Sequence, residues 1–455
     1  MAQSPPDPSG ASSIVIGPAG ITYQTHRGDT LMSIAQQWSS HSENWTAIAK
    51  INHIDKDSNI PVGTPIVIPA DLLADEPSQA QVEAVSGNVI ARTSDGKNIA
   101  LQVGVKFSEG VQIETGVDGF LTMSLPDASR ISLPSNSRVK FSKLRMARYT
   151  KSPRTELTLQ RGHIESRVAP LDANHGSYEV HTPSSVAGVR GTQFRVGVDG
   201  GGVTNEVLSG KVAVGDAKHV SDLPLSAGQG NIVNAKGVGA EIDLLPAPQL
   251  DSAAHNGNVG DKAQIQLLPV AGARAYHVQI ANDPDALDVL AESRSNSTHF
   301  KFASLAEGSY FARVSAIDKN GLEGLVNIQP ISFHPGMGQD RGAAAAPNFA
   351  PFVDSYDDKS VTLRWQAQAA KEFNVQVARD AQFTWLIFNS TTGKPEAQLP
   401  RPAFGTYYTR VQAINVDGSV TPFSATQPFI VTDHWVINDG GPANAKRHPA
   451  SADRS

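Results

Sequence analysis

The sequence of 455 residues contains no cysteine. The chain can therefore form no disulfide, no thiolate metal site and no covalent intermediate on a cysteine. It has no run of about 18 apolar residues, the length that a helix needs to cross a membrane, so we expect no transmembrane segment. The N-terminus lacks the basic region and apolar core of a signal peptide. The chain is therefore either cytosolic or a mature form from which a signal peptide has been removed.

The common sequence signatures of enzymes are also missing. The chain has no Gly-x-Ser-x-Gly elbow, no His-Glu-x-x-His pair, no P-loop and no dinucleotide-binding Gly-x-Gly-x-x-Gly. The 13 histidines are scattered, and no two of them stand four residues apart as metal ligands on a helix would. We expect His26 and His181 to be surface or strand residues, and the carboxylate pair Asp357–Asp358 to fall in a turn. The sequence therefore predicts no enzyme activity, no cofactor and no metal site.

Charged residues are few and nearly balanced in sign. They make up 18% of the chain and leave a net charge of −6, so the chain as a whole does not attract polyanions. Apolar residues make up 40%, which suits several small domains better than one large core. With 39 glycines and 29 prolines, we expect many turns between short strands. A chain of this length holds about three or four domains of about 100–200 residues each.

Residues 1–19 are rich in proline, serine and glycine, and predict a disordered leader. Residues 20–70 predict a first compact domain that contains both helices and strands. Asp29 or Thr30 can cap the first of its two helices, because short polar side chains accept hydrogen bonds from free main-chain N–H groups. The pattern predicts a strand at 21–25, helices around 31–38 and 45–51, and a turn with a closing strand at 60–69.

The order strand–helix–helix–strand, with Gly-Asp-Thr-Leu at 28–31 and Ile-Pro-x-Gly-x-x-Ile-x-Ile-Pro at 60–69, resembles the LysM module. This family binds glycans that contain N-acetylglucosamine, such as peptidoglycan, in a groove between the loop before the first helix and the loop after the second. Thr25 stands where valine is usual and Met32 where a bulky aromatic residue is usual, and we expect neither to disrupt the fold. The resemblance implies these glycan-binding residues: Gly28, Asp29, Thr30, Leu31, Asn52, Ile54 and Asp57.

The chemistry of these positions fits a glycan, since main-chain amides and short polar side chains suit acetamido groups and apolar edges suit sugar faces. A structural explanation stays open beside it. Asp29 and Thr30 would then only cap the helix, and Leu31 would only belong to the core.

After a linker at 70–80, residues 82–245 predict a strand-rich domain. Apolar residues alternate in short runs that are separated by turn sequences and recur about every 8–12 residues. This spacing predicts an all-β sandwich, roll or solenoid.

Several motifs of this region resemble the FecR domain, a periplasmic module first known from an iron-citrate regulator. They are Gly110-Val-Gln-Ile113, Leu125-Pro-Asp127, Leu159-Gln-Arg-Gly162 and the stretch from Thr182 to Val196. The full regulator of that family also carries an N-terminal helical segment for a sigma factor and a membrane span. Neither is found in this sequence, so we do not extend the resemblance to sigma-factor control.

The most distinctive stretch, Tyr178–Val196, has two β-like runs around a Gly-Val-Arg-Gly-Thr core. We expect its two central glycines to allow main-chain conformations or close contacts that a Cβ would block. The arginine between them could reach a ligand carboxylate, but we favour a structural, half-buried arginine. The motif residues, predicted to be structural, are Gly188, Arg190, Gly191 and Thr192.

Lysine and arginine residues are concentrated in the segment just before this stretch. Residues 138–167 hold nine lysines and arginines against Glu156 and Glu165. Such a cluster could attract an anionic partner, for example a phosphorylated glycan or a lipid head group, although a solvated strand face would have the same composition. We expect no nucleic acid partner, because few aromatic side chains are interleaved. The candidate patch consists of Lys140, Lys143, Arg145, Arg148, Lys151 and Arg154.

The last part of the chain contains an internal repeat. The sequence Val-Gln-Ile-Ala at 278–281 recurs at 375–378, and 308–321 recurs at 405–418, with the same offset of 97 residues. A period of this length suits an immunoglobulin-like sandwich.

In each copy a Tyr-x-x-Arg-Val-x-Ala strand runs toward an Asn-Gly or Asp-Gly turn, which resembles fibronectin type III domains. We expect Tyr310 and Tyr407 to tie strands together as corner tyrosines. The predicted repeats are 249–335 and 347–433, and a disordered tail is predicted at 437–455.

The sequence therefore predicts a multidomain, mainly β protein that is exported to the periplasm or cell envelope of a bacterium. It would bind peptidoglycan or another N-acetylglucosamine glycan, and display its other domains for protein or ligand binding. An envelope protein is the expected partner of these domains, with its identity open. The main alternative is a signalling component that relays ligand or envelope state to a membrane partner. A peptidoglycan-processing enzyme is disfavoured because the catalytic motifs are missing.

Overall fold

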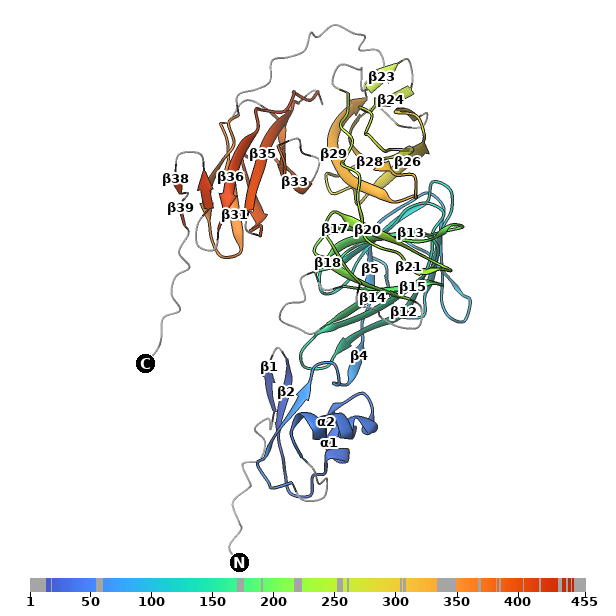
Figure 1. Ribbon diagram of the computed structural model, residues 1–455, viewed down its shortest axis with the longest axis vertical. Helices are drawn as coiled ribbons and strands as arrows, with labels where there is room; N and C mark the ends of the chain where they lie inside the picture. Colours follow the sequence, from blue (N-terminus) through green and yellow to red (C-terminus); the bar gives the residue numbers. More distant parts are fainter. Residues whose placement is uncertain are drawn as a thin grey trace, which may run out of the picture.

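The computed structural model consists of four units in succession, the first with helices and the other three built of strands (Figure 1). The expectation of a multidomain, mainly β protein is therefore confirmed. Within the residues that the structure describes, no helix is both long and apolar enough to span a membrane. The described residues are 14–17, 19–54, 60–169, 176–189, 191–216, 223–251, 257–259, 262–302, 305, 308–333, 349–366, 370–381, 383, 386–403, 405–416, 419–432, 436–438, 441–442 and 444–445.

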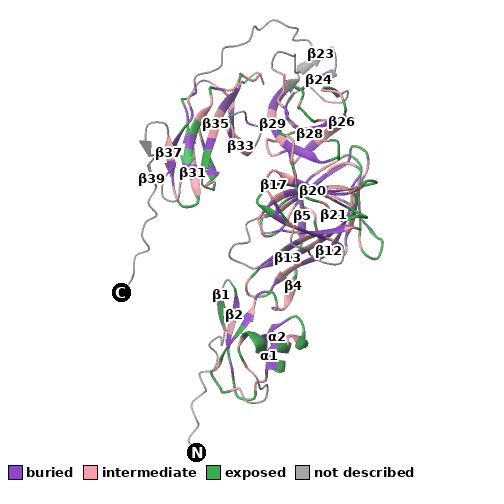
Figure 2. Ribbon diagram, in the orientation of Figure 1, coloured by how far each residue is buried: buried purple, intermediate pink, exposed green. Residues whose placement is uncertain are grey.

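The first unit packs two short helices against a three-stranded antiparallel sheet. Apolar side chains at helical spacing bury one face of α1, and Ile48 anchors α2 in the same core. Figure 2 shows the outer faces of both helices exposed. The elements are β1 (Ile14–Gly17), β2 (Gly20–Gln24), α1 (Leu31–Trp38), the short 3-10 helix η1 (Ser42–Asn44), α2 (Trp45–Ile51) and β3 (Pro65–Pro69).

The leader that the sequence predicted to be disordered contains β1. This strand pairs antiparallel with β2, Ile14 opposite Tyr23. Ile14 also packs against the core of the first unit, so the end of the leader gains both main-chain hydrogen bonds and apolar contact. Residues 1–13 lie outside the described part of the chain.

The predicted linker at 70–80 belongs to the two units on either side of it. Leu73 is fully buried in the core of the first unit. Directly after it, β4 (Asp75–Pro77) pairs antiparallel with β12 (Arg138–Ala147) of the second unit. The prediction was wrong because an acidic, proline-containing segment has loop composition, yet it can serve as a short edge strand.

The second unit is an all-β domain in which two sheets enclose one apolar core. The 15-residue strand β13 (Pro153–Arg167) belongs to both sheets, because its first half pairs with β12 and its second half with β16 (Gln193–Asp199). The prediction of an all-β domain is confirmed, and β13 joins its sheets into one network of 19 described strands. Its other strands are β5 (Ala80–Ser86), β6 (Val89–Arg92), β7 (Asn98–Ile99), β8 (Lys106–Phe107), β9 (Gln112–Thr115), β10 (Phe120–Ser124), β11 (Arg130–Leu133), β14 (Ser177–His181), β15 (Ser185–Val189), β17 (Gly202–Ser209), β18 (Lys211–Asp216), β19 (Leu223–Ser226), β20 (Gln229–Asn234), β21 (Gly237–Val238) and β22 (Ile242–Asp243).

The third and fourth units share one strand arrangement. A sheet of order β26-β25-β28-β29 faces β23-β24-β27 in the third unit, and β33-β32-β35-β36 faces β34-β31-β30 in the fourth. The equivalent strands β25 and β32 begin 97 residues apart, at Ala275 and Glu372, which is the offset of the sequence repeat. The predicted pair of fibronectin type III-like sandwiches is thus confirmed.

The strands of these two units complete the description of the fold. The third unit has β23 (Gly257–Val259), β24 (Lys262–Gln266), β25 (Ala275–Ala281), β26 (Val289–Ser295), β27 (His299–Phe302), β28 (Gly308–Ile317) and β29 (Glu323–Phe333). The fourth has β30 (Phe352–Tyr356), β31 (Ser360–Arg364), β32 (Glu372–Ala378), β33 (Leu386–Thr392), β34 (Glu396–Pro400), β35 (Gly405–Ile414), β36 (Gln427–Val431), β37 (Val436–Asn438), β38 (Gly441–Pro442) and β39 (Asn444–Ala445).

Tyr407 is a corner tyrosine as predicted, since its hydroxyl donates to the Ala403 carbonyl over 2.6 Å. Tyr310 is buried at the equivalent position, and its corner role stays a prediction. The second hairpin turn, Asp417–Gly418, lies outside the described residues.

The predicted disordered tail also contains structure. β37 and β38 extend the sheet beyond β36, and β39 pairs parallel with β30. The carboxamide of Asn438 bonds both main-chain groups of Val353, accepting from its N–H at 2.8 Å and donating to its carbonyl at 2.6 Å. This side chain joins the tail to the first strand of the fourth unit, a contact that sequence composition does not reveal.

The fourth unit lies beside the third (Figure 1). The Gln376 amide donates to the Ile328 carbonyl, and the Asn389 amide donates to the Pro284 carbonyl over 2.8 Å. Ile414 of β35 joins an apolar cluster that includes Phe311 of the third unit. The two repeats therefore share an interface with both apolar and polar contacts.

Candidate functional site

The loop between β2 and α1 carries three of the predicted glycan-binding residues, and a fourth, Leu31, is the first residue of α1. The Asp29 carboxylate accepts from the His26 main-chain N–H at 2.6 Å and from the Tyr23 hydroxyl at 2.7 Å. The Tyr23 hydroxyl also lies 2.9 Å from the Nδ1 atom of His26. Gly28 is exposed at the tip, with a φ of +93° that few residues other than glycine adopt. The loop is therefore fixed by side-chain contacts to the domain, while its tip is open.

Of the two candidate caps for α1, the structure selects Thr30. Its hydroxyl accepts from the Ser33 main-chain N–H at 3.1 Å, and the Ser33 hydroxyl accepts from the Thr30 N–H at 2.9 Å. This reciprocal pair is a capping box. Asp29 instead closes the loop, and Leu31 is fully buried in the core. Any contact of Leu31 with a glycan would thus involve its main chain.

Tyr23 remains a hydrogen-bond donor across physiological pH. Burial, followed by the hydrogen bond to Asp29, raises the pKa of the Tyr23 hydroxyl to about 12. The Tyr23 hydroxyl therefore keeps its proton for the hydrogen bond that holds the loop. Sequence reasoning missed the roles of Tyr23 and His26, although a tyrosine, a histidine and an aspartate spaced three residues apart were a visible signal.

The opposite loop begins at Asn52, the C-cap residue of α2. Its amide nitrogen donates to the carbonyls of Ile48 at 2.9 Å and Val67 at 2.8 Å, and its oxygen accepts from the Val67 N–H at 2.7 Å. Asn52 thereby ties α2 to β3. Ile54 is half-buried against the core, and Asp57 lies outside the described residues.

Thr25, one of the two departures from the LysM pattern, has a structural role. Its hydroxyl donates to the Pro61 carbonyl at 2.7 Å and accepts from the Thr64 N–H at 2.9 Å. Val62, between these two residues, is 67% exposed beside the groove loop. Met32, the other departure, is also exposed on α1. The exposed side chains of Val62 and Met32 are apolar surfaces of the kind that a sugar face contacts.

The candidate basic patch is largely paired with carboxylates of the chain itself. Lys143 and the buried Arg154 both contact Asp75 of β4, and Arg154 also donates to the Ala70 carbonyl. Arg145 pairs with Glu109, and Lys151 pairs with Glu76. Lys140 and Arg148 are exposed, with no ion pair in the described part of the chain. Three of the six side chains therefore pair with β4, at the joint between the first two units.

The joint between the first and second units also contains apolar contacts. Ala147 and Tyr149, next to the turn between β12 and β13, pack into the core of the first unit. The rings of Trp38 and Tyr149 lie with their centroids 5.4 Å apart. The first and second units therefore share one apolar cluster and several ion pairs.

The Gly-Val-Arg-Gly-Thr motif connects β15 to β16. Gly191 has a φ of +70°, as expected for a glycine that makes a turn possible. The Thr192 hydroxyl donates to the Lys211 carbonyl at 2.8 Å, which ties this turn to β18. Gly188 is different, because a Cβ there would meet no atom within 4 Å, so the steric expectation was wrong at this position. Arg190 lies outside the described residues.

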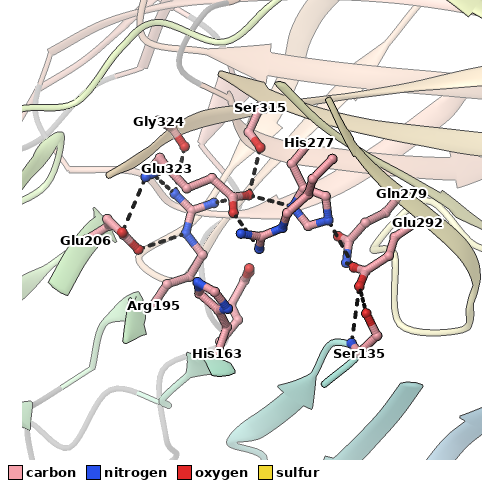
Figure 3. Close-up of polar contacts among 12 residues, drawn as sticks. Ser135, His163, Arg195, Glu206, His277, Gln279, Glu292, Ser315, Glu323 and Gly324 are labelled. Atoms are coloured by element: carbon pink, nitrogen blue, oxygen red, sulfur yellow. Dashed lines mark hydrogen bonds and ion pairs between the residues drawn. The ribbon is translucent and has the colours of Figure 1, made fainter. Parts of the chain in front are cut away.

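A buried ion-pair network, which the sequence analysis did not predict, joins the second unit to the third (Figure 3). Arg195 of β16 lies 3.4 Å from Glu206 and 3.1 Å from Glu323. Glu323 also contacts one ring nitrogen of His277, whose other nitrogen lies 2.9 Å from Glu292. Because a buried charge without its partner is costly, this network holds the two units in one relative orientation.

The carboxylates of this network differ strongly in proton affinity. Burial raises the pKa of Glu206 to about 7. Burial acts in the same direction on Glu292, but the hydrogen bond and charge of His277, together with Ser135 and Arg294, outweigh it and lower the pKa to about 2. The pKa of Glu323 also lies well below its usual value, because attraction to His277 and Arg195 outweighs its burial. Charged residues inside apolar strands were the available signal for this network, but partners 128 residues apart could not be matched from sequence.

Comparisons with known proteins agree with the first two domain assignments. The model of the LysM domain matches residues 23–69, and the model of the FecR protein family matches residues 111–213. No curated protein matches the chain.

Among solved structures, one similar protein is a candidate anti-sigma factor from Parabacteroides distasonis, with 18% identity and a TM-score of 0.24 over 29% of this chain and 59% of that one. The chain thus spans about three fifths of the length of that relative. A two-domain fibronectin type III segment of chicken tenascin has 12% identity and a TM-score of 0.17 over 42% of this chain and 100% of its own. Fibronectin(III)-like modules of Clostridium thermocellum CbhA have 12% identity and a TM-score of 0.16 over 41% of this chain and 94% of theirs. Residues 23–69 thus match the LysM domain and residues 111–213 match the FecR family, and the strand order of the two repeats is that of fibronectin type III-like sandwiches.

Proposed function

We propose that this protein is a non-catalytic cell-envelope protein that binds peptidoglycan, or another N-acetylglucosamine glycan, through its LysM domain. The observation that carries the proposal is the fixed shape of the loop between β2 and α1. Asp29 and Tyr23 hold this loop, and Asn52 holds the start of the opposite one. A binding loop that is already ordered loses little conformational entropy when a ligand binds.

The proposed contacts follow from exposure. Gly28 is open at the loop tip, so a sugar can approach the main chain there. The open main chain of Gly28 would bind an acetamido group, with Asp29, Thr30 and Leu31 fixing the shape of its loop, while Ile54 and Asp57 would contact the sugar from the opposite loop. LysM and FecR domains are binding or signalling domains, which supports a role without catalysis. Their usual place is the bacterial envelope, so we propose that the protein is exported to the periplasm.

Titration with chitin oligosaccharides, followed by calorimetry, tests the proposed groove. Gly28→Trp should fill the open tip and reduce affinity by about tenfold or more, because it blocks the approach of the sugar. Lys50→Ala, on the exposed face of α2, is the matched control and should bind as the wild type does. If Gly28→Trp retains full affinity while its LysM domain stays folded, the groove is not the binding site.

A second candidate function is the relay of envelope state to a membrane partner through the FecR domain. It is favoured by the joint between the LysM and FecR domains, where Arg154 and Tyr149 connect the two. A glycan bound to the LysM domain would then fix where the FecR domain lies.

In-cell photocrosslinking tests this second candidate. A probe at Lys140, on the exposed face of β12, should capture a membrane protein, and the yield should fall in the Gly28→Trp variant. Capture of no membrane protein, or equal capture in both variants, would remove the relay function and leave glycan binding untouched.

A further inference from the structure

A small cavity of about 60 Å³ lies between the FecR domain and the first fibronectin-like repeat. Strands β11, β13 and β16 of the FecR domain meet strands β25, β26 and β28 of the repeat around it. Figure 3 shows part of its polar wall. The charged side chains that line it are five arginines and three carboxylates: Arg130, Arg167, Arg195, Arg294, Arg313, Glu165, Asp285 and Glu323.

The charges in the interior of this cavity are paired within the protein. Arg195 and Glu323 are about 95% buried and contact each other. Arg313 forms an ion pair with Glu165, and Arg294 lies 3.2 Å from Glu323. These contacts fix the inner side chains, so the interior is rigid and nearly neutral.

The rim differs from the interior. Arg130 of β11 and Arg167 of β13 stand directly opposite each other across the antiparallel pair. Like charges in this position are destabilising unless an anion lies between them. Within the part of the chain that the structure describes, both arginines pair with the same carboxylate, Asp285, which lies 3.8 Å from Arg130 and accepts a long hydrogen bond of 3.5 Å from Arg167. Two guanidinium groups thus share one carboxylate among the described residues of the rim.

Apolar side chains line the cavity behind the rim. Leu133 and Ile164 come from the FecR domain, and Leu287 and Val289 come from the repeat. The ring of His163 also faces this space, and its closest acid, Asp199, lies 3.6 Å away. A bound molecule would meet two guanidinium groups first and hydrocarbon behind them.

We propose that this cavity binds a small carboxylic acid with a short apolar chain, the carboxylate lying between Arg130 and Arg167. Guanidinium groups bind carboxylates through paired N–H donors, and two of them can share one ligand group. One water needs about 10–15 Å³ of such volume, so the cavity has room for about four to six water-sized groups. This room suits a chain of a few carbon atoms. The ligand would touch both domains and strengthen their contact.

Calorimetric titration of the full chain with butanoate tests the proposal, with butyramide as the uncharged analogue and inorganic phosphate as an anion without a chain. At constant ionic strength, butanoate should bind saturably and raise the melting temperature of the FecR domain and first repeat. Butyramide and phosphate should bind about tenfold more weakly or not at all. Equal binding of butyramide, stronger binding of phosphate, or no saturable binding of butanoate would overturn the proposal.

Two kinds of variant should change butanoate affinity in opposite directions. Arg130→Gln combined with Arg167→Gln should weaken it about tenfold or more, whereas Asp285→Asn should strengthen it by removing a competing carboxylate. Arg92→Gln, an exposed arginine of β6, is the matched control and should have no effect. Unchanged binding in the folded double variant, or weaker binding in Asp285→Asn, would show that the rim does not hold the ligand. The second variant keeps the test valid if the first fails to fold.

Discussion

Asn52 shows how one residue of the proposed groove also stabilises the LysM domain. Its side chain makes three hydrogen bonds to main-chain groups of α2 and β3. A sequence comparison places it among ligand contacts, and the structure gives it a role in the fold as well. Both can be true, because an ordered loop is a condition for binding.

Replacing Asn52 by alanine should destabilise the LysM domain by about 0.5–1.5 kcal/mol, since main-chain groups of α2 and β3 lose their side-chain partner. Amide hydrogen exchange in the full chain measures this change, as faster exchange in peptides covering 45–51 and 65–69. Lys50→Ala, on the same helix but exposed, should leave exchange unchanged. Equal exchange rates in the Asn52 variant and this control would contradict the prediction.

Glu206 should make the joint between the FecR domain and the first repeat sensitive to pH. Burial raises its pKa to about 7 from an ordinary value of 4.5, so the folded protein retains a proton that the unfolded chain releases. This contribution to stability is fully present below about pH 4.5 and is lost as pH rises through about 7. Glu323 acts in the opposite direction, because its pKa is lowered and its contribution is lost only in acid.

Glu206→Gln should therefore be more stable than the wild type at pH 8 by about 1–3 kcal/mol, with a smaller difference at pH 5.5. Scanning calorimetry of the full chain at the two pH values measures the effect. The exposed Glu241→Gln is the control and should show no such pH-dependent difference. A loss of stability at pH 8 in Glu206→Gln would instead show that Arg195 requires the ionised carboxylate.

A helix or strand could be predicted from sequence where its spacing of apolar residues lies within the element itself. The apolar spacing of α1 and the alternation in β12 and β13 each suffice to identify a helix or strand. β1, β4 and β37 were missed because each is short and is stabilised by a partner elsewhere in the chain. Pairing of this kind adds hydrogen bonds without requiring a distinctive sequence.

The candidate sites also differ in how far local sequence could predict them. The predicted groove residues follow from a family motif; the structure places Gly28, Asp29 and Thr30 in one loop, and their contact with a glycan stays a prediction. The basic patch was identified as a cluster, but its partners Asp75 and Glu109 could not be, because strand pairing brings them close. The cluster therefore looked free in sequence and is mostly paired in the structure.

Arg154 tests whether β4 fixes the LysM domain to the FecR domain. Removing its buried guanidinium with Arg154→Ala leaves Asp75 without its main partner, and breaking such a pair costs about 3–5 kcal/mol. Limited proteolysis should then cut 70–80 at least about tenfold faster than in the wild type, because local opening becomes easier. Arg148→Ala, exposed on the same hairpin, should be cut at the wild-type rate. Equal resistance in both variants would mean that apolar packing alone holds this segment.

At the scale of the whole molecule, contacts between units connect the chain from end to end. The LysM and FecR domains share an apolar cluster, the FecR domain and the first repeat share an ion-pair network, and the two repeats lie side by side (Figure 1). These contacts involve residues far apart in sequence, which is why domain content could be predicted and domain arrangement could not. The shape of the molecule thus depends on a few interface residues.

Ile414 is the residue that best tests the contact between the two repeats. It is 5% exposed in an apolar cluster with Phe311 and Ile328 of the first repeat. Ile414→Asp would bury an unpaired carboxylate there, and separation of the repeats returns that charge to water. Small-angle X-ray scattering should therefore show a larger radius of gyration than in the wild type, while circular dichroism keeps its β signal. Val416→Asp, at a position 85% exposed, should scatter as the wild type does, and an unchanged radius in folded Ile414→Asp would show that other contacts hold the repeats together.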